Sequence, residues 1–235
     1  MIRGIDKWLP GYFRSVMSRP RGFCGKRHLM VCIADHFEPF QGGDDVGSAV
    51  EQVARWQAAL PRINEAATDS AGTHPKHTFF YPQEDYHPDI LNRLAALCHR
   101  GHGEVEVHLH HHNDTAEGLK EKLVTFRDQL HEQHALLGKD KAGRPRYAFI
   151  HGNWTLCNAH PEGIHCGVDA ELGILEETGC FADMTFPSAP SPTQPRMVNT
   201  IYYARDLAHG PRSADAGVPA QVGRTDTPGL LLIPG

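Results

Sequence analysis

The sequence predicts an α/β fold in which strands and helices alternate along the chain, as a parallel sheet or a (β/α) barrel. Three observations support this prediction. Apolar, strand-like runs alternate with segments whose apolar residues recur at helical spacing. Four such strand–helix units follow one another between residues 28 and 179. The 235 residues are enough for one large domain, and 40% hydrophobic with 22% charged residues is the composition of a globular protein.

The first two strand–helix units precede residue 102. Residues 28–40 begin as a continuous apolar run and then turn polar, which indicates a buried strand whose end opens into a site. A helix with a serine near its cap is predicted over 48–60. Residues 77–85 predict the second strand. The helix predicted over 89–101 follows a proline and ends at a glycine, as helices often do.

The third and fourth units follow directly. Residues 104–110, EVEVHLH, alternate with the period of two that is typical of a strand. Residues 115–138 predict a long amphipathic helix that again ends at a glycine. Residues 146–154 predict a fourth strand with its following loop, and 167–179 predict a fourth helix.

The C-terminal part predicts further strands. Residues 180–187 are a fifth strand, and 198–205 are a sixth after a loop rich in proline and serine. Residues 206–227 predict mostly loop, and the chain stops at an apolar strand, GLLLIPG (229–235). Because such a strand needs a covering helix or a partner, we expect either that a C-terminal part is missing or that a barrel closes incompletely here.

Composition and charge restrict the class of protein. The net charge of −5 argues against a general nucleic-acid binder, which would need a basic surface. No apolar run approaches the roughly 20 residues of a membrane-spanning helix, and residues 1–22 lack the apolar core of a signal peptide. We therefore expect a cytoplasmic protein with an N-terminal extension (1–27) and one domain (28–235). The extension predicts a helix, or alternatively a surface-docking segment. The six cysteines form no CxxC pair, which favours small buried residues over a zinc knuckle.

The candidate chemistry collects where the predicted strands end. In βα folds, ligands bind beyond the carboxyl ends of the strands. Each predicted strand from the first to the fifth ends in groups able to bind a cation or to move a proton. Strand by strand they are Asp35, His36 and Glu38; Gln83, Glu84 and Asp85; His108, His110, His112 and Asp114; His151, Asn153 and Trp154; Asp183 and Thr185.

The histidine run is the strongest of these signals. The chain has 17 histidines, and four of them fall within residues 108–112. His108 and His112 share a face whether the chain turns helically after Leu109 or continues as a strand, so this pair is the first candidate for a metal site. Neutral imidazole and carboxylate suit zinc and other divalent transition metals. The alternative is a polar strand end of biased composition, in which His110 and His111 are surface or supporting residues.

Two strand-end motifs resemble those of the polysaccharide deacetylase (NodB-homology) superfamily. VCIADHF resembles a strand that ends in two aspartates, with Asp35 at the position of the catalytic base and His36 in place of the metal-binding aspartate. EVEVHLHHH resembles the strand whose two histidines stand four residues apart, here His108 and His112. His151 falls where that superfamily has an arginine, and the superfamily's last strand, which carries the catalytic acid in a Leu-x-His motif, is not found before residue 235.

This resemblance implies a distorted (β/α) barrel of about seven strands that holds a divalent metal with His36, His108 and His112, or with Asp35 as a ligand. The metal is expected to be zinc, with nickel, cobalt and manganese as alternatives. Further roles are implied for residues at other strand ends. They are Asp35, His151 and Asp183 as catalytic groups, Glu84, Tyr86, Asn153 and Trp154 as substrate contacts, and His110 and Asp114 as support for the ligands.

The function implied is removal of N- or O-acyl groups from a carbohydrate by a metal-dependent hydrolase. Alternating histidines at strand ends also serve other metal-dependent hydrolases, of the phosphoesterase or amidohydrolase type. The altered first motif and the abrupt end favour a third alternative, a carbohydrate- or metal-binding domain without catalysis. The sequence does not indicate an oligomeric state.

Overall fold

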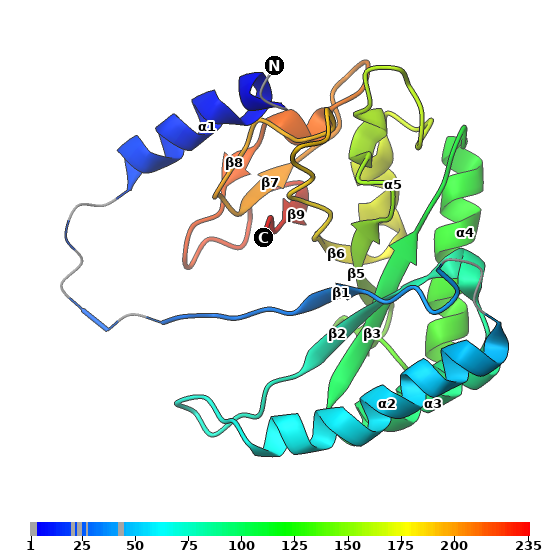
Figure 1. The fold of residues 1–235 in the computed structure, drawn as a ribbon. Helices are drawn as coiled ribbons and strands as arrows, with labels where there is room; N and C mark the ends of the chain where they lie inside the picture. Colours follow the sequence, from blue (N-terminus) through cyan, green and yellow to red (C-terminus); the bar gives the residue numbers. More distant parts are fainter. Residues whose placement is uncertain (1–3, 20–21, 23–24, 27, 42–44) are drawn as a thin grey trace. The chain divides into compact units, whose positions relative to one another are not determined.

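The computed structural model describes residues 4–19, 22, 25–26, 28–41 and 45–235. The protein has an α/β fold, as the sequence predicts (Figure 1). Its strand pairing is mostly parallel but mixed, with antiparallel pairs that the sequence did not indicate. Closure into a barrel stays a prediction. The chain divides into two compact units. The β1–β3 unit contains 33–109 and 122–147, and the β6–β9 unit contains the described residues of 1–32 together with 110–121 and 148–235.

The β1–β3 unit is built on three parallel strands. They are β1 (Ala34–His36), β2 (His77–Pro82) and β3 (Gly103–Leu109), in that order in the sheet. All six residues of β2 are buried, because a neighbouring strand pairs with it on each side and the sequence HTFFYP is largely apolar. The register sets His36 opposite Phe80 and His108 opposite Pro82, so the polar ends of β1 and β3 lie at the same edge.

Helices cover these strands within the unit. They are α2 (Val46–Glu65), α3 (Pro88–His99), which follows the 3₁₀ turn η1 (Gln83–Asp85), and part of α4 (Ala116–Asp128), which contributes to both units. Figure 1 shows α2 and α3 packed together, and α3 also contacts β3. The π-helical turn η2 (Gln129–Gln133) extends α4, and the short strand β4 (Gly138–Lys139) pairs antiparallel with the start of β5.

The β6–β9 unit contains the second set of strands. They are the end of β5 (Pro145–His151), β6 (Cys180–Asp183), β7 (Tyr202–Ala204), β8 (Val218–Pro219) and β9 (Leu230–Leu232). β9 lies between β6, to which it is parallel, and β7, to which it is antiparallel. The apolar strand predicted at the end of the chain therefore has a partner on each side. The helices are α1 (Ile5–Ser18) and α5 (Glu171–Thr178), with 3₁₀ turns η3 (Leu156–Asn158) and η4 (Ser213–Asp215).

Several elements are shorter than the sequence predicts, among them the long helix, now α4 with η2, and the fifth and sixth strands, now β6 and β7. The first strand and α5 show the reasons. The first strand has three residues, and the preceding apolar side chains of Leu29 and Met30 are 90% and 86% exposed. An apolar run forms a strand only where a neighbouring strand pairs with it, and β2 pairs only with residues 34–36 of this run. Helix α5 starts four residues late, because Gly167 takes a φ of +103° and the Asp206 carboxylate accepts hydrogen bonds from the N–H groups of the first turn. No helix of the described residues is long and apolar enough to cross a membrane.

The start of α2 allows a test of helix capping. The helix begins at Val46, two residues before the predicted start, because Asp45 Oδ1 accepts a hydrogen bond of 2.8 Å from the Ser48 N–H. We expect Asp45→Ala to lower the free energy of unfolding by about 1 kcal/mol, measured by urea denaturation. Asp45→Asn keeps an acceptor and serves as the control. An equal loss in both variants would contradict the capping role.

Candidate metal centres

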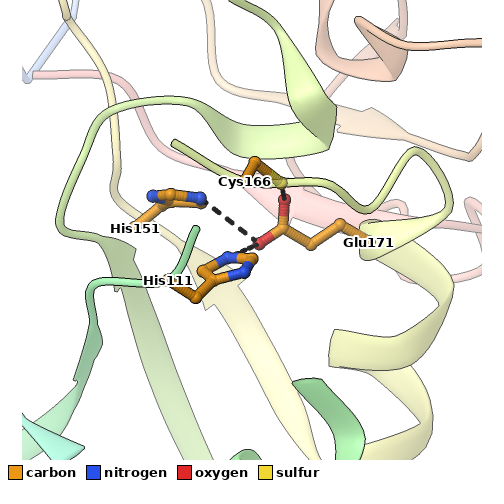
Figure 2. Close-up of side chains that lie close together, drawn as sticks. All are labelled: His111, His151, Cys166 and Glu171. Atoms are coloured by element: carbon orange, nitrogen blue, oxygen red, sulfur yellow. Dashed lines mark hydrogen bonds and ion pairs between the residues drawn. The ribbon is translucent and has the colours of Figure 1, made fainter. Parts of the chain in front are cut away.

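Four side chains of the β6–β9 unit, two imidazoles, a thiol and a carboxylate, converge in its interior (Figure 2). They belong to His111, His151, Cys166 and Glu171, and all four residues are buried. One ligand atom from each residue lies within 4.8 Å of every other. We call these residues the buried group; with this composition and spacing they could bind a metal ion.

The four residues of the buried group come from four separate segments of the chain. His111 follows β3 by two residues, His151 is the last residue of β5, Cys166 lies in the loop before α5, and Glu171 is the first residue of α5. The carboxylate is at the centre: His111 Nε2 and His151 Nε2 lie 3.3 and 3.9 Å from its Oε1. Cys166 Sγ lies 3.5 Å from its Oε2.

The electrostatics of the buried group centre on Glu171. Burial alone would raise the pKa of this carboxyl, but the imidazoles of His151 and His111 and the Cys157 N–H together hold the pKa below its ordinary value. The Cys157 N–H donates to Oε2 at 2.6 Å. Burial and the neighbouring Glu171 charge raise the pKa of the Cys166 thiol. Metal binding at this group therefore has to displace the thiol proton.

Neighbouring groups hold the ligand atoms in place. Asp114 Oδ2 lies 3.3 Å from His111 Nδ1, on the side of the ring away from Glu171, and the Asp114 N–H donates to the Cys166 carbonyl at 2.9 Å. The Asn153 amide donates to the His111 carbonyl at 3.1 Å. Asp114 and Asn153 were predicted to act at a site, and both contact this group; their roles stay predictions.

A hydrogen-bonded chain connects His151 to the third predicted catalytic residue, Asp183. The backbone N–H of His151 donates to Thr185 Oγ1 at 2.9 Å, and the Thr185 hydroxyl donates to Asp183 Oδ2 at 2.7 Å. Burial raises the pKa of Asp183 to about 7, with a contribution from the Glu171 charge, although hydrogen bonds from Thr185 oppose the shift. Asp183 is thus a buried carboxyl that titrates near neutrality.

A second group of candidate ligands lies in the β1–β3 unit. His36, Glu38 and His108 place one ligand atom each within 4.8 Å of the others. Glu38 Oε1 lies 3.6 Å from His36 Nδ1 and 3.4 Å from His108 Nε2. The His36 and Glu38 side chains are 29% and 14% exposed, whereas that of His108 is fully buried. We call these three residues the edge group, because they lie at the carboxyl ends of β1 and β3.

The structure brings together two of the three histidines predicted to bind the metal, His36 and His108, whose ring centroids are 4.7 Å apart. His112 belongs to the β6–β9 unit, where it is exposed and its Nδ1 accepts a hydrogen bond from the His165 N–H at 2.9 Å. Asp35 contacts His77 Nε2 at 3.0 Å. Because side chains alternate along a strand, its carboxylate and the His36 ring leave β1 on opposite faces. The predicted roles of His112 and Asp35 stay predictions.

The remaining predicted residues lie near strand ends, in their own units. Glu84 is exposed in η1, and the Tyr86 hydroxyl donates to Gln133 at 2.7 Å. Trp154 is 46% exposed in the turn after β5. The His110 ring fills the space beside Gly152, where an added Cβ would fall 2.3 Å from it. Their functions stay predictions.

Sequence reasoning did not select Cys166 and Glu171 as ligands, and it ranked His111 below its neighbours. A glutamate in the first turn of a helix is ordinary, so nothing in the sequence marks Glu171 as fully buried. A signal was present in the segment HCGVDAE, residues 165–171, in which a thiol precedes a carboxylate by five residues. Glu38 was recognised at the end of its strand but was not included in the ligand set.

Comparisons with family models, with curated proteins and with solved structures found no match to this chain.

Proposed function

We propose that the protein is a metal-dependent hydrolase whose catalytic metal ion is held by the edge group. The supporting observation is the composition and position of this group: three ligands of suitable type, partly exposed, at the carboxyl ends of two parallel strands. Catalytic zinc sites have three protein ligands and keep one position open, whereas structural sites are closed by four. The edge group has the first arrangement.

The three residues of the edge group differ in burial and in the strand that carries them, and each would supply one ligand to a cation. The buried His108 ring is fixed by its strand and the packing around it, and His36 and Glu38 come from the more exposed end of β1. Glu38 Oε1 faces both imidazoles, so its negative charge offsets that of a cation at this point. A divalent ion bound there acts as a Lewis acid toward a carbonyl or phosphoryl oxygen.

N- and O-acylated carbohydrates are the first substrate class to test. The support for this choice is the resemblance of VCIADHF and EVEVHLHHH to two motifs of the polysaccharide deacetylase superfamily. This proposal assigns no base, because the carboxylate of Asp35, the predicted base, leaves β1 on the face opposite to the His36 ring and contacts His77. A second set of substrates, phosphate esters and cyclic amides, distinguishes a deacetylase from the other metal-dependent hydrolases.

The test is metal content and hydrolysis in His36→Ala and His108→Ala, with His99→Ala as the control from the same unit. The His99 ring contacts the Ala135 carbonyl and is not part of the edge group. We expect each edge-group variant to lose one metal ion per chain and to lower kcat/KM about 1000-fold, equivalent to about 4 kcal/mol of transition-state stabilisation. Acetate release that persists at the wild-type rate after this metal is lost would reject the proposal.

A further inference from the structure

We propose that the buried group, His111, His151, Cys166 and Glu171, is a structural zinc site. The inference goes beyond the proposed hydrolase and does not depend on it, because it concerns different residues in a different unit. It rests on the donor atoms, on their separations, on their burial and on the partner of one imidazole.

The donor set suits zinc. Two imidazole nitrogens, a thiolate and a carboxylate combine nitrogen, sulfur and oxygen ligands that zinc accepts, and a thiolate disfavours magnesium and calcium. The thiolate and the carboxylate together carry two negative charges, which a Zn²⁺ ion neutralises. This balance matters because an uncompensated charge in a protein interior is strongly destabilising.

The separations from Glu171 are close to those of ligands around one ion. Zinc–ligand bonds of 2.0–2.3 Å in a tetrahedron put the ligand atoms about 3.3–3.8 Å apart. His111 Nε2 and His151 Nε2 lie 3.3 and 3.9 Å from Glu171 Oε1, and Cys166 Sγ lies 3.5 Å from Glu171 Oε2. The two nitrogen–oxygen distances exceed the usual length of an N–H···O hydrogen bond, about 2.9–3.0 Å.

The surroundings also fit a zinc site. The ring nitrogen of a metal-bound histidine that faces away from the metal commonly donates to a carboxylate, which fixes the tautomer and the ring orientation. His111 has this arrangement: Nε2 faces Glu171, and Nδ1 lies 3.3 Å from Asp114 Oδ2. Asp114 also holds the Cys166 segment through its backbone N–H, so one residue positions two of the four ligands.

Burial and the number of ligands indicate a structural role. All four residues are buried, with exposures of 4% for His111 and 0% for the other three, and four protein ligands complete a tetrahedron. The ion would cross-link the segment after β3, the end of β5, the loop before α5 and α5 itself. We therefore expect zinc to stabilise the β6–β9 unit.

The first test uses the wild-type chain, stripped of metal by a chelator and reloaded with Zn²⁺ or Co²⁺. We expect zinc to raise Tm by about 10 °C over the stripped protein. We expect the cobalt form to show the near-ultraviolet charge-transfer absorption of a cobalt–thiolate bond. Because the edge group contains no cysteine, this absorption cannot come from the edge group, and Cys166→Ser tests whether it comes from the buried group. Absence of the absorption at full cobalt occupancy, or a Tm unaffected by zinc, would overturn the proposal.

The second test compares Cys166→Ser with Cys180→Ser, a matched control whose buried thiol donates to the Ala182 carbonyl. We expect Cys166→Ser to lose the cobalt–thiolate absorption and most of the zinc-dependent gain in Tm, and Cys180→Ser to keep both. If Cys166→Ser does not fold, the wild-type measurements decide alone. His108→Ala is expected to keep the absorption, so a failure of the hydrolase proposal leaves this result unchanged. Loss of the absorption in the control as well would count against Cys166 as its source.

Discussion

Replacing Gly167 with alanine is expected to destabilise the protein by about 3 kcal/mol or more and to weaken metal binding at the buried group, although Gly167 is not a ligand. Its φ of +103° is one that residues with a Cβ rarely adopt. An added Cβ would also fall 2.6 and 2.7 Å from the backbone N and O of Asp114. Backbone atoms cannot rotate away as a side chain can, so the loop has to move.

The movement acts directly on Cys166, which precedes Gly167 and whose carbonyl accepts the Asp114 N–H. We expect Gly167→Ala to break this hydrogen bond, to displace the thiol and to reduce zinc affinity at least tenfold, measured by competition with a chelator. Gly163→Ala is a matched control in the same loop, because Gly163 also has a positive φ, +65°, but has open space around its Cβ position. If both variants lose the same stability and affinity, backbone strain alone explains the effect and the steric argument is wrong.

The second large effect is expected at Asp183, whose carboxyl makes stability depend on pH. The folded protein raises its pKa from the ordinary 3.8 to about 7, chiefly by burial. The folded state therefore holds this proton more tightly than the unfolded chain. The contribution of Asp183 to stability is fully present below about pH 4 and is lost as the pH rises through about 7. The difference corresponds to about 4 kcal/mol.

Asp183→Asn provides the test, because the amide has the size of the protonated carboxyl, and its NH₂ can donate to Thr185 Oγ1. We expect the two proteins to have similar free energies of unfolding at pH 4, and the variant to be about 4 kcal/mol more stable at pH 8, measured by urea denaturation. Cys157 and Tyr202, which interact with Asp183 and have raised pKa values, stay protonated between pH 4 and pH 8 in both proteins, and Glu171, whose pKa is lowered, stays charged at pH 8. A difference that does not change with pH would show that Asp183 keeps an ordinary pKa.

The alternation of strands and helices was predictable because it rests on local patterns. The run HTFFYP became the buried β2, and EVEVHL became β3, since apolar content and period two reflect burial directly. The first strand was overestimated, because Leu29 and Met30 have the composition of a strand but are exposed. Composition does not reveal where a neighbouring strand ends.

The candidate sites were predictable only in part. His36, His108 and Glu38 were identified because each lies in or just after the end of a recognisable strand, and the ends of parallel strands meet at one edge of a sheet. Cys166 and Glu171 follow no strand, and their convergence on His111 and His151 depends on how a loop returns to the end of β5. Such a contact is set by tertiary packing, which no local period encodes.

The histidine run has a consequence for how this sequence can change. His108 belongs to the edge group and His111 to the buried group, and only Leu109 and His110 separate them along the chain. A point substitution in the run affects one group at a time. A single-residue insertion between His111 and Asp114 would instead change the spacing of a ligand and its supporting carboxylate, since Asp114 Oδ2 lies 3.3 Å from His111 Nδ1. The length of this segment is therefore expected to vary less among descendants of this gene than the identity of its individual side chains, such as the exposed His112.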